Sequence, residues 1–203
     1  MIHYLEPQSI EGITITTQKH KGKDVEQLLY TPKGGFIEAK GKSLKNYFPN
    51  SPYEFEDLIY EDPANYDYKE LDNQTINGVP CYVIQATPKT KQQKDLIHYA
   101  YRVVFISKTN YALVKLQFYN KKGTLIRVFE GYDLSEKLTS LIPDRGVMVD
   151  KANKTSSIVT VVYRKEDPKL PSNMFTRGFI ENWNNKTSDN LFEANKIELK
   201  KRD

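Results

Sequence analysis

The chain has 203 residues, enough for one sizeable domain, and its formal net charge is +4 at pH 7. Hydrophobic residues make up 38% of the sequence and aromatic residues 12%, so aromatic side chains must supply much of the buried surface. Positive and negative side chains alternate along most of the chain, which gives no reason to expect a polyanionic partner. The single cysteine, Cys81, excludes an internal disulfide.

No stretch of the chain approaches the roughly 18 consecutive apolar residues of a membrane-spanning helix. The N-terminus, MIHYLEPQSI, lacks the basic and apolar regions of a signal peptide. Two interpretations stay open, a cytoplasmic protein or the mature or truncated form of an exported one.

The first part of the chain has the pattern of short antiparallel strands. Apolar and polar residues alternate over 12–19, 25–31 and 36–40, and glycine-containing turns separate these runs. Residues 51–62 interrupt the pattern, because Ser51 can cap a helix and Pro52 suits its first turn. We therefore expect hairpins followed by a short helix over residues 53–60.

Strand patterns then resume and continue through most of the chain. They cover 65–74, 79–88, 98–107, 111–133, 147–152 and 156–167. Phe175, Phe179 and Trp183 recur every four residues, and Ser172 can cap the helix that this spacing predicts over 174–183. The segment from 184 to 203 is polar, with an amphipathic stretch over 191–202 that can form a frayed helix.

The hairpin over 111–133 is the most apolar of these patterns. Asn120-Lys121-Lys122-Gly123 is typical of a turn in which glycine takes the left-handed conformation, and pairing of Asn120 with Thr124 sets the expected register. That register places Phe118 opposite Ile126, Leu116 opposite Val128, and Val114 opposite Glu130. Lys115, Gln117 and Arg127 then lie on the other face.

Nine or ten strands with two or three short helices predict a mainly β protein. An antiparallel sheet of that size is expected to twist and curl strongly. We expect a single domain over residues 1–183 and a polar C-terminal tail over 184–203.

Motifs for catalysis or metal binding are not found in the sequence. His3, His20 and His98 lie far apart and are not paired at ligand spacing, and no nucleophile or phosphate-binding motif occurs. Cys81 lies in the apolar run VPCYVI, which favours a buried, inert thiol. We expect no catalytic residue, no metal and no cofactor.

The charged clusters have ordinary explanations. A solvated helix face accounts for the acidic residues Glu54, Glu56, Asp57, Glu61 and Asp62 better than a catalytic pair does. Lysines lie in loops while aromatic residues lie within strands, a separation that argues against nucleic-acid binding.

Five segments follow one another in the chain: LLYTPKGG, SPYEFEDL, GVPCYVIQATPK, VFISKTNYALVKLQFYNKKGTLIRVFE and MFTRGFIENW. Together, in this order, they resemble the LolA-like outer-membrane lipoprotein-sorting protein family. The resemblance covers residues 4 to 183. Three departures are a proline in SPYE, Gln117 where the family has Glu, and the lack of the family's usual N-terminal helix and strands.

The resemblance implies a strongly curved antiparallel sheet, an incomplete barrel with two or three short covering helices around a hydrophobic cavity that accepts acyl chains. It implies a non-enzymatic protein of the periplasm or cell envelope of a Gram-negative bacterium, which binds a lipid or lipoprotein acyl chain. An envelope exporter or outer-membrane acceptor is an expected partner, and such a role is compatible with peripheral contact with a membrane. An exposed sheet edge would allow a homodimer to form by edge pairing. The candidate cavity residues are Leu29, Ile84, Val114, Leu116, Phe118, Ile126, Val128 and Phe179.

The alternative is a structural or protein-interaction module of the envelope, in which the same side chains form a filled core and bind no ligand.

Overall fold

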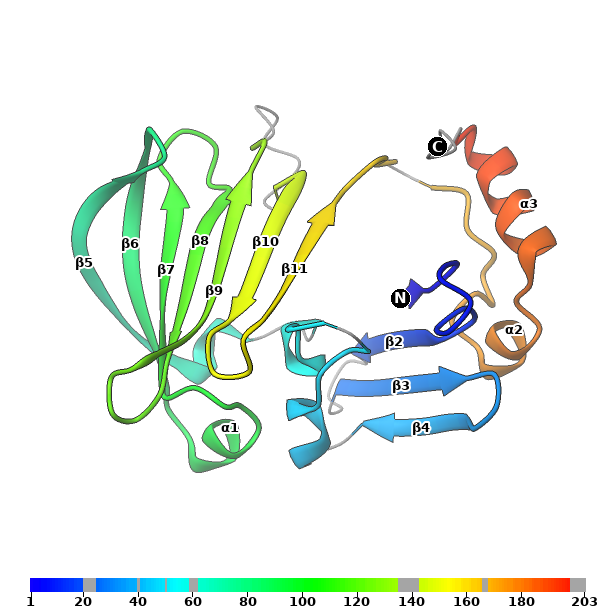
Figure 1. Cartoon of the computed structure of the whole chain (residues 1–203), viewed down its shortest axis with the longest axis horizontal. Coiled ribbons are helices and arrows are strands. Elements are labelled where there is room, and N and C mark those ends of the chain that lie inside the picture. The colour runs from blue at the N-terminus through cyan, green and yellow to red at the C-terminus, as the bar shows by residue number, and fades with distance from the viewer. Residues whose placement is uncertain are drawn as a thin grey trace. The chain divides into compact units, whose positions relative to one another are not determined.

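The computed structural model describes residues 1–19, 25–39, 41–49, 51–58, 62–134, 143–165 and 168–197. It divides into two compact units (Figure 1). The first unit comprises Met1–Lys40 and Val162–Asp203, and the second comprises Gly41–Val161. The mainly β, antiparallel fold expected from the sequence is confirmed, with its strands divided between two sheets.

The first unit contains a four-stranded antiparallel sheet in the order β1-β2-β3-β4. The strands are β1 (Ile2–His3), β2 (Thr14–Lys19), β3 (Val25–Thr31) and β4 (Gly35–Ala39). Two helices follow later in the chain, α2 (Arg177–Glu181) and α3 (Asn185–Asn195).

The helices of this unit begin at capping side chains. Thr176 caps α2 by accepting a hydrogen bond from the Phe179 N–H, so the expected cap at Ser172 and start near residue 174 are wrong. Asn184 begins α3 with a reciprocal capping box to Thr187, a signal in the polar tail that fixes a regular helix there. The indole of Trp183 stacks on His3 with ring centroids 4.4 Å apart.

The second unit is a seven-stranded antiparallel meander in the order β11-β10-β9-β8-β7-β6-β5 (Figure 1). The strands are β5 (Tyr66–Ile76), β6 (Val79–Pro88), β7 (Tyr101–Ser107), β8 (Leu113–Tyr119), β9 (Leu125–Tyr132), β10 (Arg145–Asp150) and β11 (Thr155–Thr160). Short helices η1 (Gly41–Lys45), η2 (Phe55–Leu58), η3 (Pro63–Asn65) and α1 (Lys91–Asp95) flank it. The helix expected over 53–60 is thus a single 3-10 turn at 55–58, and residues 59–61 lie outside the described residues.

Both faces of the seven-stranded sheet carry apolar clusters. We call one the aromatic face; its cluster is Tyr66, Ala86, Ile97, Tyr99, Phe118, Phe129 and Met148. We call the other the aliphatic face; its cluster is Cys81, Val83, Val103, Phe105 and Val114. The burial of Cys81 is confirmed, its thiol donates to the Val79 carbonyl at 3.2 Å, and burial raises its pKa.

The register predicted for the β8–β9 hairpin is wrong by one residue beyond the turn. The turn itself is as expected, because the Asn120 N–H donates to the Thr124 carbonyl at 3.0 Å and Gly123 is left-handed. A bulge then leaves Ile126 unpaired, since Tyr119 pairs with Leu125 while Phe118 pairs with Arg127.

This one-residue shift moves side chains to the opposite face from that point on. Val128 now pairs with Gln117, and Glu130 pairs with Lys115 instead of Val114. Arg127, expected on the solvent side, shares the aromatic face with Phe118. Val114 is itself displaced by a second bulge in the β7–β8 pairing and packs in the aliphatic cluster.

Candidate functional site

The aromatic face carries a row of aliphatic side chains that are only half-buried. Ile84, Val104 and Leu116 lie opposite one another on β6, β7 and β8, so they project from the same face. Leu116 also pairs with Phe129, which joins this row to the buried cluster. We call Ile84, Val104 and Leu116 the apolar row; it offers a continuous apolar surface across three strands.

A second set of apolar side chains extends the surface toward one end of the sheet. Tyr82 pairs with Ile106, and Ile106 pairs with Leu113 across the bulge. Ile106 and Leu113 are half-buried and Tyr82 is exposed. The accessible apolar area is therefore wider than the row itself.

A packed aromatic group bounds the apolar row toward the other end of the sheet. The Tyr99 and Phe118 rings meet edge to face at 5.1 Å, and the Tyr66 and Tyr99 hydroxyls lie 3.1 Å apart. The Tyr99 hydroxyl donates to Glu56 Oε1 at 3.1 Å, and the Gln93 side-chain amide donates to the Tyr66 hydroxyl at 3.1 Å. This part of the face is a filled core in which both tyrosine hydroxyls are hydrogen-bonded.

Beneath the aromatic group lies a buried ion cluster centred on Arg127. Its side chain is 2% exposed, and it donates two hydrogen bonds to the Asp57 carboxylate, at 2.8 and 3.1 Å. Arg127 Nη1 also lies 3.4 Å from Glu54 Oε1 and donates to the Pro52 carbonyl at 3.2 Å. The guanidinium stands 4.3 Å from the centroid of the Phe118 ring. Arg127 thereby fastens the acidic segment to the sheet.

Glu54, Glu56 and Asp57 are therefore not part of a solvated helix face, whereas Asp62 is exposed and Glu61 lies outside the described residues. Glu54 is fully buried and pairs with Tyr47 in an isolated bridge just before η2, and Glu56, within η2, is 5% exposed. The sequence signal was available in the run Phe55-Glu56-Asp57-Leu58, where acidic and apolar residues share one turn, but their cation lies 70 residues away in β9.

Burial and charge shift the acid–base properties of this cluster. Burial raises the pKa of Glu54, although Arg127 and the His98 ring, 3.0 Å away, favour its ionised form. Burial, assisted by Asp57, raises the pKa of Tyr53 to about 12. Burial disfavours the charge on Arg127, but Asp57 and Glu54 outweigh it and raise the pKa of Arg127. The guanidinium is a permanent cation here.

A second polar contact joins the segment after η1 to the β10–β11 turn. The Tyr47 hydroxyl donates to Asp150 Oδ2 at 2.7 Å, and the Asn153 side-chain amide donates to the Tyr47 hydroxyl at 3.0 Å. Burial opposes ionisation of Asp150, but hydrogen bonds from Asn153 and Tyr47 outweigh it and lower the Asp150 pKa. Tyr47 also stacks on His98 at 6.3 Å.

The structure brings together half of the candidate residues named from the sequence. Ile84, Leu116, Phe118 and Ile126 belong to the aromatic face; Phe118 is buried in its core, and Ile126 packs against that core. The shared wall predicted for the hairpin is corrected, because Val114 and Val128 belong to the aliphatic side. Val104, Arg127 and Glu54, which also belong to this face and its ion cluster, were not among the candidates.

Leu29 and Phe179 belong to the first unit, whereas the aromatic face belongs to the second. Leu29 is half-buried on β3, opposite Ile15 and Ile37. Phe179 meets Trp183 edge to face at 5.5 Å and lines an open groove of about 540 Å³. The groove is bordered by Lys169, Leu170, Pro171, Phe179, Thr187, Asn190, Leu191 and Ala194.

Among the described residues, no group of three or more His, Cys, Asp or Glu side chains is placed to hold a metal ion. Within the same residues, none of the helices has both the length and the apolar character needed to cross a bilayer. The aliphatic side chains of the apolar row can make van der Waals contact with a hydrocarbon chain.

Three solved structures share this fold. A proposed outer membrane lipoprotein-sorting protein domain from Vibrio parahaemolyticus matches with a TM-score of 0.77 and 20% identity, over 88% of this chain and 75% of that one. A DUF1329 family protein from Desulfovibrio piger matches with a TM-score of 0.66 and 17% identity, over 88% and 75%. A LolA superfamily protein from Nitrosomonas europaea matches with a TM-score of 0.61 and 19% identity, over 87% and 76%.

A comparison with curated proteins found no match. A model of an uncharacterized-protein-like family matches residues 1–182. The resemblance seen in the sequence motifs is thus confirmed at the level of the fold. The chain belongs to this uncharacterized-protein-like family, and its fold is that of the LolA-like outer-membrane lipoprotein-sorting proteins.

Proposed function

We propose that the protein is a non-enzymatic lipid- or lipoprotein-binding protein of the bacterial envelope that holds acyl chains against the apolar row. The observation that carries the proposal is the alignment of Ile84, Val104 and Leu116 across three strands, each half-buried. Transfer of an acyl chain from water is worth about 0.8 kcal/mol per buried methylene, so such a surface can hold a lipid without polar contacts.

The fold supports the same proposal. The Vibrio parahaemolyticus domain that shares it is described by outer membrane lipoprotein sorting, and lipoproteins carry the acyl chains that the row would bind. On this proposal the protein acts in the periplasm or at the cell envelope. An exporter or an acceptor that exchanges the lipid with it remains an expected partner.

One observation favours the alternative of a filled interaction module. Phe118, Phe129 and Met148 are buried on the same face, so part of the surface that the sequence assigned to a cavity is packed core. The two functions differ in what occupies the apolar row: an exchangeable acyl chain, or protein alone.

Displacement of a fluorescent fatty acid tests the proposal. Leu116→Ala shortens the wall of the row, and we expect it to weaken probe affinity about tenfold, because roughly two methylene contacts of the ligand are lost. Leu71→Ala is the matched control, since Leu71 is a half-buried leucine on β5 that packs against the aliphatic cluster. It should leave probe affinity unchanged.

Thermal unfolding of both variants distinguishes a loss of probe binding from a loss of the folded structure. A wild-type protein that binds no displaceable probe and copurifies with no lipid in native mass spectrometry would exclude the carrier function. Equal weakening by both substitutions would exclude the apolar row as the site.

A further inference from the structure

One end of the seven-stranded sheet collects lysines from three separate connections. In an antiparallel meander successive connections alternate between the two ends, so those after β6, β8 and β10 fall at the same end. Figure 1 shows α1 and the two hairpin turns together there. We call this the lysine end; its lysines are Lys89, Lys91, Lys94, Lys121, Lys122, Lys151 and Lys154.

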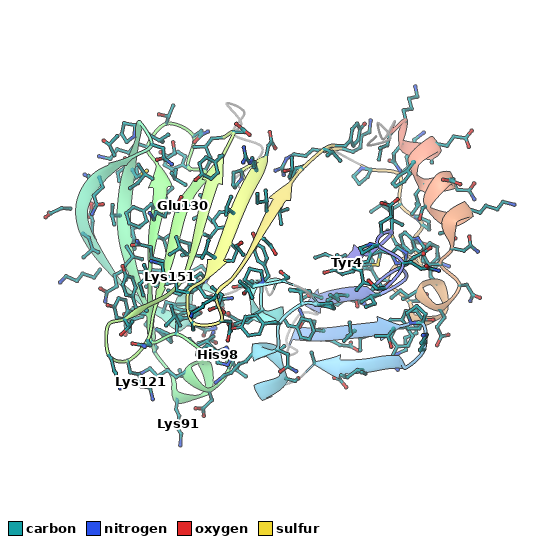
Figure 2. The ribbon with its side chains drawn as sticks, in the orientation of Figure 1. Tyr4, Lys91, His98, Lys121, Glu130 and Lys151 are labelled. Atoms are coloured by element: carbon teal, nitrogen blue, oxygen red, sulfur yellow. The ribbon has the colours of Figure 1, made fainter. Side chains whose placement is uncertain are left out.

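The exposed charge of this end is mainly positive, whereas the carboxylates of Glu54, Asp57 and Asp150 face inward toward Arg127 and Tyr47. All seven lysines are exposed, and Figure 2 shows Lys91 and Lys121 projecting there beside His98. The exposed carboxylates nearby are Asp62, Asp67 and Asp95. Of the seven lysines, only Lys89 forms an ion pair within the described part of the chain, with Asp67 at 3.6 Å. The described connections at the opposite end carry Lys108 against Asp133 and Asp144.

Side-chain caps hold each of the three connections in a defined conformation. Thr90 caps α1 by accepting from the Gln93 N–H, and Asn120 Oδ1 accepts from the Lys122 and Thr124 N–H groups at 2.9 and 3.0 Å. Asp150 Oδ1 accepts from the Ala152 and Asn153 N–H groups of the third turn, at 2.8 and 2.9 Å. The lysines are thus presented from fixed backbones.

The composition of this end favours a diffuse anionic surface over a defined phosphate site. The three connections contain seven lysines and no arginine. Arginine forks bind single phosphates with two parallel hydrogen bonds, whereas the lysine ammonium acts as a hydrated point charge. Several lysine charges on turn tips suit the negative surface potential of an anionic bilayer, because each lysine adds to the attraction without needing a phosphate in a fixed position.

We propose that the lysine end docks the protein onto the surface of an anionic phospholipid bilayer. The inference goes beyond acyl-chain binding and does not depend on it, because it rests on the charge of the turn tips and not on the apolar row. Docking here would hold the seven strands end-on to the membrane, with β6, β8 and β10 entering the contact at their C-terminal ends.

Cosedimentation with vesicles tests the inference. The wild-type protein should bind phosphatidylcholine vesicles that contain phosphatidylglycerol, fail to bind pure phosphatidylcholine vesicles, and detach at about 0.5 M salt. The triple variant K91Q/K121Q/K151Q removes one lysine from each connection, and its partition coefficient should fall about 100-fold. The matched control K33Q/K69Q/K186Q removes three exposed lysines elsewhere and should change it less than about twofold.

The result can also overturn the inference. Absence of binding to the phosphatidylglycerol vesicles, or equal losses in the two triple variants, would show that the lysine end is an ordinary solvated surface. Displacement from vesicles by a single-stranded oligonucleotide at equal charge concentration would assign the surface to nucleic acid instead. If the wild-type protein binds the vesicles but binds no fatty-acid probe, membrane docking stands and the proposed carrier function fails.

Discussion

Replacement of Arg127 by methionine is the most direct test of how the buried ion cluster stabilises the fold. Methionine keeps much of the packing over Phe118 but leaves Asp57 and Glu54 without their cation and the Pro52 carbonyl without a donor. Removal of one partner of a buried pair costs about 3 to 5 kcal/mol. The bidentate geometry, with bonds of 2.8 and 3.1 Å, places the expected loss near the middle, at about 4 kcal/mol.

Urea unfolding followed by circular dichroism measures this loss. The matched control is the triple variant R127M/E54Q/D57N, which removes the carboxylate charges together with their cation. Because the desolvation of three charges no longer opposes folding, the triple variant should recover at least half of the stability lost by R127M. A loss below about 1 kcal/mol in R127M, or a triple variant no more stable than the single one, would refute this account of the cluster.

Three further outcomes follow from other contacts. The Lys115 ammonium, 2.7 Å from Glu130, lowers the pKa of that carboxyl. The stabilisation that Glu130 contributes is therefore fully present above its unfolded-state pKa and is lost as pH falls through its lower folded-state pKa. In K115M the urea midpoint should depend less on pH on the acid side; a pH profile identical to that of the wild type would contradict this account. Gly146→Ala should lower stability by about 1 to 3 kcal/mol in thermal unfolding, because the new Cβ would lie 2.5 Å from Phe129 Cε2; unchanged melting would show that the ring moves freely. The β11 edge, where Ile158 is 62% exposed, should pair with a second copy, and light scattering should show a dimer that Ile158→Lys abolishes; a wild-type monomer at high concentration would exclude it.

The strands were predictable because their signals are local. The two-residue alternation and the Asn120–Gly123 turn specify a hairpin without reference to the rest of the chain, and the structure confirms the turn. The bulge at Ile126 was not predictable, because leucine, isoleucine and valine at 125, 126 and 128 satisfy either face equally well. Local pattern therefore located the hairpin but could not decide its register.

The candidate site could be predicted only in part for the same reason, since its residues depend on the register of the strands. Ile84 and Leu116 were named from their patterns, but Val104 was missed because Val103 beside it is equally apolar, and only the pairing of β6, β7 and β8 shows which one shares the aromatic face. Arg127 and Glu54 were assigned to solvent for a different reason. A charged residue is expected to be exposed unless a partner is known, and these partners are some 70 residues apart in sequence.

In the second unit, directional polar contacts hold one end of the sheet, whereas the apolar row is held by non-directional contacts. At the lysine end, Arg127 ties η2 to β9, and Tyr47 ties the segment after η1 to Asp150 at the base of the β10–β11 turn. Those bonds are directional, and the bonds of Arg127 are also shielded from water, so they hold backbone positions more firmly than dispersion contacts do. The apolar row has no comparable constraint, because its side chains meet neighbours only through non-directional contacts. A rigid end that bears the charge and an adaptable face that bears the hydrocarbon surface are the two properties that a protein needs in order to meet a membrane at one site and exchange lipid at another.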